Sequence, residues 1–145
     1  MANTRKIRDV MTPDPACVSE KDSIGDAAKI MAREDTGVVP VVDGKRVIGM
    51  VTDRDIVVRL VAEGKDPKQC RVNEAMTKGV KTIRDDSSID DALNLMGGAN
   101  VRRAPVVNDR DEIVGIVSIG DISTDTKSDK VGKAIENISQ APPNN

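Results

Sequence analysis

The sequence of 145 residues contains no phenylalanine, tyrosine or tryptophan. Its core must therefore be built from Val, Ile, Leu, Met and Ala side chains. Without aromatic rings, the chain also lacks the flat surfaces on which proteins stack the bases of a single strand. A nucleic-acid binder usually carries a basic face, whereas this chain has a formal net charge of −2 and scattered Lys and Arg residues. Nucleic-acid binding is therefore disfavoured.

Histidine is absent too, and cysteine occurs only twice, at Cys17 and Cys70. The two cysteines share no CxxC spacing, which predicts free thiols and no metal site. Most general-base and nucleophilic constellations lose their usual base when histidine is missing. These absences argue against an enzyme and against a catalytic cofactor.

Long apolar runs are also missing. No stretch of 18 apolar residues occurs, and the first ten residues hold no apolar segment typical of a secretion signal. The hydrophobic and charged fractions, 38% and 32%, are ordinary for a globular protein. We therefore expect a soluble, cytoplasmic protein.

What the sequence does contain is an internal repeat. The segments that match at an offset of 65 residues include Met11-Thr12 with Met76-Thr77, Ser23-Ile24 with Ser88-Ile89, and Pro40-Val41-Val42 with Pro105-Val106-Val107. The offset then becomes 66, which matches Asp55 to Asp121. Ordered matches that shift by one residue predict a duplicated unit. Since each unit is too small to bury its own apolar face, the halves are expected to pack together, and a ligand fits naturally at their junction.

Each half predicts the order strand, helix, strand, strand, helix. The first helix follows Ser23 or Ser88, each with an Asp three residues on, which is the spacing of a capping box. Its apolar residues at helical spacing are Ile24, Ala27, Ala28 and Met31 in the first half, and Ile89, Ala92, Leu93 and Met96 in the second. Two apolar strands then form a hairpin, around Asp43-Gly44 in the first half and around 108–112 in the second.

The predicted fold class is therefore α/β (α+β), with small sheets. The first motif covers 7–64 and the second covers 72–125. Residues 126–145 form a C-terminal tail, in which Val131, Ile135 and Ile138 lie at the spacing of a short helix. No GxGxxG or GxxxxGK[ST] sequence is present, so a Rossmann or P-loop site is not indicated.

The segments that carry chemistry are 49–55 and 115–121, each of which runs from an apolar strand into a helix. Thr52 precedes Asp55 by three residues, and Ser118 precedes Asp121 likewise. A helix N-terminus suits a phosphate, and a carboxylate can accept hydrogen bonds from both hydroxyls of a ribose. The same spacing is also that of a capping box, which needs no ligand. The residues alone leave both interpretations open.

Taken together, these patterns resemble a pair of CBS motifs, a Bateman module. The resemblance rests on Met-Thr before an extended segment, the Ala-Met helix face, the hydrophobic-Pro-Val-Val strand, and Gly-hydrophobic-Val-Thr/Ser-x-x-Asp-Ile. It covers about residues 7–124 and occurs twice in register. It implies two β-α-β-β-α units packed with pseudo-two-fold symmetry, with clefts that bind AMP, ADP, ATP, NAD(H) or S-adenosylmethionine.

The resemblance also implies a role for particular residues. Asp55 and Asp121 would hold ribose hydroxyls, and Thr52 and Ser118 would lie near phosphate. Basic residues before the proline contact phosphate in some family members, which makes Arg102 and Arg103 candidate phosphate ligands, although a solvated pair at a strand start is the simpler alternative. The adenine pocket would be formed by Cys17, Val18, Val38, Val39 and Pro40, and by Thr82, Ile83, Ala104 and Pro105.

The two copies differ where a ligand would lie. Arg54 of the first copy, a further candidate for phosphate, is replaced by Gly120 in the second. The two sites are therefore expected to be unequal. Cys17 is interpreted as a small apolar filler, because a reactive thiol needs surroundings that stabilise the thiolate.

The favoured interpretation is a non-enzymatic sensor of adenine nucleotides. It would act as a homodimer through its helices, with the Ile56, Val57, Leu60 and Val61 stripe contributing, and would signal to an unknown regulated protein. A ligand-free structural module is the first alternative. A small nucleotide hydrolase that uses Asp53 and Asp55 is the second, and a nucleic-acid binder is the third.

Overall fold

The computed structural model describes residues 5–123 and divides into two compact units. One unit comprises Pro15–Val80. The other combines the N-terminal segment through Asp14 with the chain from Lys81 onward. The predicted C-terminal tail over 126–145, with its short helix, lies outside the described residues. Within residues 5–123 the fold is mixed α+β, with two sheets and four α-helices, which confirms the predicted fold class.

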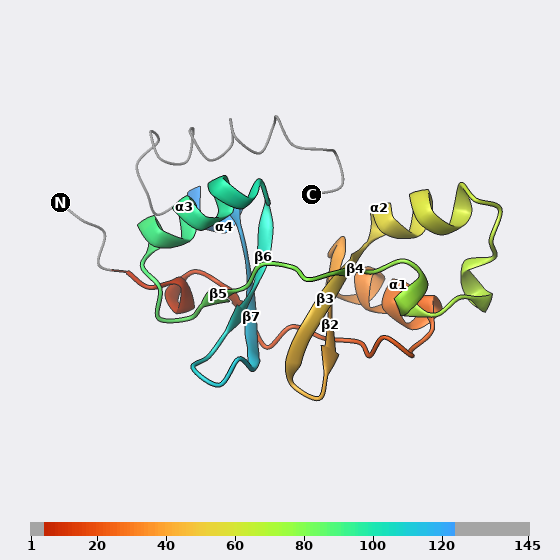
Figure 1. Ribbon diagram of the computed structural model, residues 1–145, viewed down its shortest axis with the longest axis horizontal. Coiled ribbons are helices and arrows are strands. Elements are labelled where there is room, and N and C mark those ends of the chain that lie inside the picture. Colours follow the sequence, from red (N-terminus) through yellow and green to blue (C-terminus); the bar gives the residue numbers. More distant parts are fainter. Residues whose placement is uncertain (1–4, 124–145) are drawn as a thin grey trace. The chain divides into compact units, whose positions relative to one another are not determined.

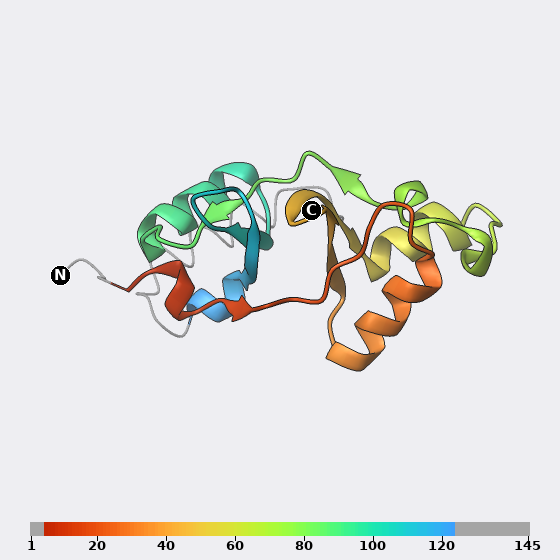
Figure 2. The same ribbon diagram turned by 90° about the horizontal axis from the view of Figure 1, so that it is seen from below.

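The unit Pro15–Val80 contains a three-stranded sheet of order β2-β3-β4. Its elements are α1 (Ile24–Glu34), β2 (Val38–Asp43), β3 (Arg46–Thr52), α2 (Asp53–Ile56), η2 (Val57–Val61), η3 (Pro67–Gln69), η4 (Val72–Glu74) and β4 (Thr77–Lys78). The predicted hairpin is confirmed, since β2 and β3 pair antiparallel. In its turn Gly44 adopts a φ of 64°, which glycine reaches at no steric cost. Helices α1 and α2 lie on the same side of the hairpin (Figures 1 and 2).

The other unit contains a four-stranded sheet of order β1-β7-β6-β5. Its elements are η1 (Ile7–Asp9), β1 (Thr12–Pro13), β5 (Ile83–Arg84), α3 (Ile89–Ala99), β6 (Arg103–Val107), β7 (Ile113–Ser118) and α4 (Ile119–Ser123). Strands β6 and β7 form the second predicted hairpin, and β5 runs parallel to β6. The first half has only a single bridge, between Val18 and Val41, where the second half has β5.

The first helix of each half is bounded by matching residues. The Ser23 and Ser88 hydroxyls accept hydrogen bonds from the backbone N–H of Asp26 and Asp91, both at 3.1 Å, as the capping spacing predicts. At the other end, Asp35 and Asn100 adopt left-handed backbone, with φ of 51° and 59°. Short polar residues tolerate this conformation, so both helices stop at the same point.

The two compact units do not coincide with the two sequence repeats, because each repeat's leading segment pairs with the other repeat's hairpin. We call residues 7–13 and 72–78 the leading segments. Strand β1 pairs with β7, and β4 pairs with β3. Equivalent glycines make room for this pairing. A Cβ on Gly49 would collide with the carbonyl of Thr77, and one on Gly115 would lie 2.9 Å from the carbonyl of Thr12.

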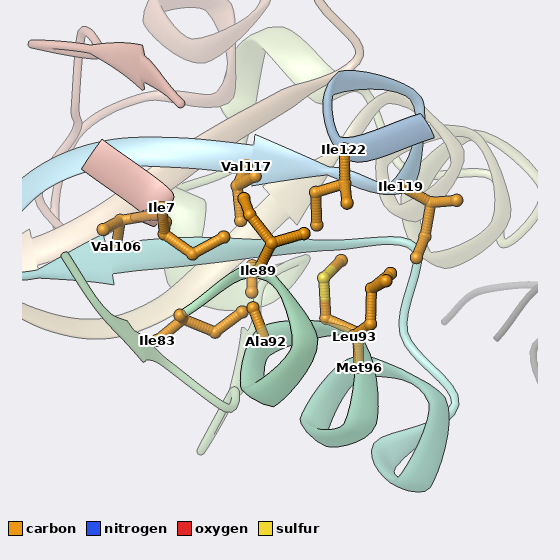
Figure 3. Close-up of a cluster of buried hydrophobic side chains, with 11 residues drawn as sticks. Ile7, Ile83, Ile89, Ala92, Leu93, Met96, Val106, Val117, Ile119 and Ile122 are labelled. Atoms are coloured by element: carbon orange, nitrogen blue, oxygen red, sulfur yellow. The ribbon is translucent and has the colours of Figure 1, made fainter. Parts of the chain in front are cut away.

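The cores of both units are aliphatic, as the composition requires. In the unit that contains α3, the helix packs its apolar face against the sheet (Figure 3). All four residues of the predicted stripe on α3 are buried. On α1 only Ile24 and Ala27 are buried, whereas Ala28 is exposed and Met31 is half-buried. The α1 prediction was therefore only partly right, since helical spacing alone does not say how wide a stripe the neighbouring elements cover.

Candidate functional site

Both predicted hydroxyl–carboxylate turns fold into reciprocal capping boxes. In the first, Thr52 Oγ1 accepts from the Asp55 N–H at 3.0 Å, and Asp55 Oδ2 accepts from the Thr52 N–H at 3.0 Å. In the second, the corresponding distances between Ser118 and Asp121 are 3.1 Å and 2.9 Å. The capping interpretation is thus correct as geometry. Each box engages only Oδ2 through these bonds, and the role of the turns in ligand binding stays a prediction.

Asp55 is the buried charged residue at the centre of the first turn. Its side chain is 2% exposed, and its Oδ1 atom has no hydrogen-bond donor among the described residues. A buried acceptor without a donor costs free energy, by about 1–3 kcal/mol for a typical polar group. Asp55 therefore holds one oxygen that a donor from a bound molecule could satisfy. Asp121, by contrast, is only half-buried.

Arg59 is a residue of this site that the sequence analysis missed. Its Nε lies 3.8 Å from Asp55 Oδ1, too far for a hydrogen bond but close enough for an ion pair. Its guanidinium donates to the backbone carbonyls of Ala75 and Met76, at 3.3 and 2.9 Å, and to Thr77 Oγ1 at 3.3 Å. Arg59 thus ties the carboxylate to a leading segment. The signal was present, because residues i and i+4 of opposite charge adjoin on a helix.

The strand register places the residues before each proline beside the turn hydroxyls. Val38 on β2 pairs with Thr52, and Arg103 on β6 pairs with Ser118. The structure therefore places two predicted phosphate ligands of the second repeat, Arg103 and Ser118, opposite each other on β6 and β7, and Arg102 lies directly before β6. Arg102 is exposed and Arg103 is half-buried.

The residues predicted to line an adenine pocket lie together within each unit, but most of them are buried in the hydrophobic core. The Val18 N–H donates to the Pro40 carbonyl at 3.0 Å, which sets Cys17-Val18 beside β2. In the other unit, Ile83 pairs alongside β6. The predicted wall residues that are buried are Val18, Val38, Val39, Pro40, Ile83, Ala104 and Pro105, whereas Cys17 and Thr82 are half-buried. Their contact with a base stays a prediction.

Cys17 does not have the surroundings of a reactive thiol. Its Sγ donates to the Pro15 carbonyl at 3.3 Å, and burial raises the pKa of the thiol. A raised pKa keeps the sulfur protonated at neutral pH, and the thiolate is the nucleophile. The interpretation of Cys17 as a filler therefore has physical support.

The unit Pro15–Val80 also contains an open hollow of about 480 Å³. It is lined by Ser19, Glu20, Lys21, Val42, Asp43, Ile48 and Lys78. None of the predicted site residues lines it. Within residues 5–123, no three Cys, Asp or Glu side chains gather in a group that could hold a metal ion. In the same part of the chain, no helix is long and apolar enough to cross a bilayer.

Comparison with known proteins identifies the family of this chain. The family model for the CBS domain matches this chain twice, over residues 7–62 and 72–124, and the chain belongs to that family. Among its relatives is the CBS domain-containing protein YhcV of Bacillus subtilis, which is 38% identical over 134 residues, covering 92% of this chain and 94% of YhcV.

Two similar solved structures contain adenosine compounds. CBSX2 in complex with AMP has a TM-score of 0.68 at 26% identity, covering 82% of this chain and 93% of CBSX2. The CBS domain pair of protein MJ0100, in complex with 5′-methylthioadenosine and S-adenosyl-L-methionine, has a TM-score of 0.72 at 30% identity, covering 83% of this chain and 98% of that chain. One of these ligands carries a phosphate and the other two do not.

Proposed function

We propose that this chain is a regulatory module that binds an adenosine-containing ligand, with Asp55 and Asp121 each accepting hydrogen bonds from ribose hydroxyls. The observation that carries the proposal is the buried Oδ1 of Asp55, which lacks a hydrogen-bond donor within residues 5–123. A ribose hydroxyl is such a donor. The AMP, methylthioadenosine and S-adenosylmethionine bound by the similar structures all contain ribose.

The test is a calorimetric scan of the melting temperature with AMP, ADP, ATP, NAD, NADH and S-adenosylmethionine. Calorimetry is chosen because the chain has no aromatic residue for intrinsic fluorescence. A ligand present at 100 times its dissociation constant stabilises the folded state by about 2.7 kcal/mol. We expect at least one compound to raise the melting temperature. If all of them leave it unchanged at millimolar concentration, the chain is a structural module instead.

The hydrolase alternative is tested on the same samples. A binding module leaves AMP, ATP and NAD chemically intact, so no product should accumulate over hours. Steady turnover that is lost in Asp55→Ala would replace the regulatory proposal with an enzymatic one. A salt-sensitive association with DNA or RNA would favour the nucleic-acid alternative.

We further propose that the module forms a homodimer through the helix Asp53–Val61. Val57, Val58 and Val61 on this helix are 55%, 39% and 53% exposed, whereas Leu60 is buried in the core. Exposed apolar side chains that gather on one helix can form an interaction site between protein chains. The stripe expected from the sequence is thereby corrected: Leu60 belongs to the unit's own core, and Val58 joins the outer face. Sedimentation of Val57→Asp/Val61→Asp should give a monomer, whereas Glu63→Gln should sediment like the parent.

A further inference from the structure

We call the turn 52–55 with residues 37–38 the first half-site, and the turn 118–121 with residues 102–103 the second. We infer that the two half-sites select ligands of different charge. Because of the carboxylate of Asp53, the first half-site would prefer adenosine compounds that carry no phosphate. The inference rests on the proposed function, because it concerns the same turns. It starts from one backbone contact that both repeats share. The Asp53 N–H donates to the Gly37 carbonyl at 3.0 Å, and the Ile119 N–H donates to the Arg102 carbonyl at 2.9 Å.

The side chains at the two ends of this backbone hydrogen bond differ between the repeats. In the first repeat, the carboxylate of Asp53 lies over Gly37: a Cβ placed there would be 3.0 Å from Oδ2 and 3.2 Å from Oδ1. Only glycine leaves room for it without a shift. In the second repeat, the residue at the place of Asp53 is Ile119, whose side chain is 8% exposed and belongs to the core. The residue at the place of Gly37 is Arg102, which is exposed.

The residues around this contact therefore give the two equivalent turns different net charges. In the first repeat, the carboxylate of Asp53 offsets the guanidinium of Arg54. In the second, Arg102 and Arg103 add to +2, because Ile119 and Gly120 carry no charge. The register places Gly37 and Arg102 at equivalent points next to the turns, since the residues that follow them pair with Thr52 and Ser118.

A phosphate is sensitive to this difference. Two unit charges about 4 Å apart interact by about 1 kcal/mol in water and by more near a protein surface. The carboxylate of Asp53 therefore cancels the attraction that Arg54 offers a phosphate, whereas the two guanidinium groups of the second repeat favour a phosphate. The preference for a phosphorylated ligand should differ between the repeats by roughly tenfold. A neutral thioether or a sulfonium in place of the phosphate does not need that attraction. The first half-site fits adenosine compounds of that class, and the second fits a nucleotide.

The experiment measures the affinities of adenosine and AMP by titration calorimetry. Each half-site is studied alone by weakening the other with an isosteric substitution. Asp121→Asn weakens the second half-site, so that the first is measured, and Asp55→Asn weakens the first, so that the second is measured. We expect the Asp121→Asn protein to bind adenosine at least as tightly as AMP. Adding Asp53→Asn should shift its preference about tenfold towards AMP. Glu63→Gln, which changes the net charge equally at an exposed position, should shift nothing. Asp53→Ser provides a second way to remove the same charge.

In the Asp55→Asn protein, AMP should bind more tightly than adenosine, and Arg102→Gln should reduce that preference while Arg110→Gln does not. The experiment distinguishes failure of the proposed function from failure of the charge selection. If the parent protein binds neither adenosine nor AMP nor any other compound of the melting scan, the proposed function itself is wrong. If they bind, but both half-sites prefer AMP equally or Asp53→Asn acts no differently from Glu63→Gln, the charge selection by Asp53 is wrong and the proposed function stands.

Discussion

The turn at Thr52–Asp55 and the turn at Ser118–Asp121 close with the same two hydrogen bonds, yet their surroundings differ. Asp55 is buried and faces Arg59, which holds a leading segment by its carbonyls. Asp121 is half-buried, and the residue at the place of Arg59 is Asp125, outside the described residues. A duplicated motif thus preserves the backbone of its turn while each copy acquires its own neighbours. Function can then diverge without a change of fold.

The largest effect is expected at the glycines that both repeats share. Gly49→Ala should lower the free energy of unfolding by about 3 kcal/mol, because the new Cβ would collide with the backbone carbonyl of Thr77. Gly115→Ala should cost less, about 1–2 kcal/mol, since its nearest neighbour is the flexible Met11 side chain. Urea unfolding followed by circular dichroism measures both. The control is Gly98→Ala on α3, where nothing lies within 4 Å and the change should stabilise by about 0.5–1 kcal/mol. Equal losses at Gly49 and Gly98 would show that the close approach is not the cause.

The next effect separates the two carboxylates. Asp55→Ala should destabilise the fold by about 2 kcal/mol, because it removes a cap and leaves Arg59 without its buried partner. Asp121→Ala should cost about 1 kcal/mol, the ordinary loss of a cap. The same unfolding measurements compare them. A larger loss at Asp121 would contradict the asymmetry described above.

A smaller effect is expected at Arg59. Arg59→Met keeps the aliphatic stem but loses the bonds to Ala75, Met76 and Thr77, and should cost about 1 kcal/mol. Hydrogen exchange of the backbone amides in 72–78 should become faster, because Arg59 donates to this segment, while exchange in 7–13 should not change. As a control, Arg84→Met removes an exposed arginine that forms an ion pair with Asp86 and should leave both segments as they are. Equal acceleration in both leading segments would point to a global loss of stability instead.

The smallest effect concerns Cys17. Because burial raises the pKa of its thiol, less thiolate is present at pH 8 than for an exposed cysteine. Iodoacetamide should therefore modify Cys17 more slowly in the folded protein than in the protein unfolded in urea, as mass spectrometry can follow. Modification as fast as that of a small-molecule thiol would revive a reactive role for this residue.

Much of the architecture could be predicted because it is encoded locally. Ser23 and Ser88 cap their helices, and Asp43-Gly44 turns the hairpin, through contacts within a few residues. The site was less predictable.

Thr52 and Asp55 formed the expected turn, but Arg59 was overlooked. Its role depends on hydrogen bonds to backbone carbonyls 16 and 17 residues away in the sequence, which no local pattern reveals. Val58 was overlooked for a different reason: the helix widens into a π-helix at Val57–Val61, which rotates its faces relative to a 3.6-residue period.

The sequence by itself determined the duplicated β-α-β-β-α order, the aliphatic cores and the two hydroxyl–carboxylate turns. Each depends on periodicity, composition or spacing over a short stretch of chain. Only the tertiary structure decided that each leading segment pairs with the other repeat's hairpin, that Asp55 is buried while Asp121 is not, and that Asp53 lies over Gly37. These outcomes depend on which distant segments share a surface, and burial and charge are set by those neighbours.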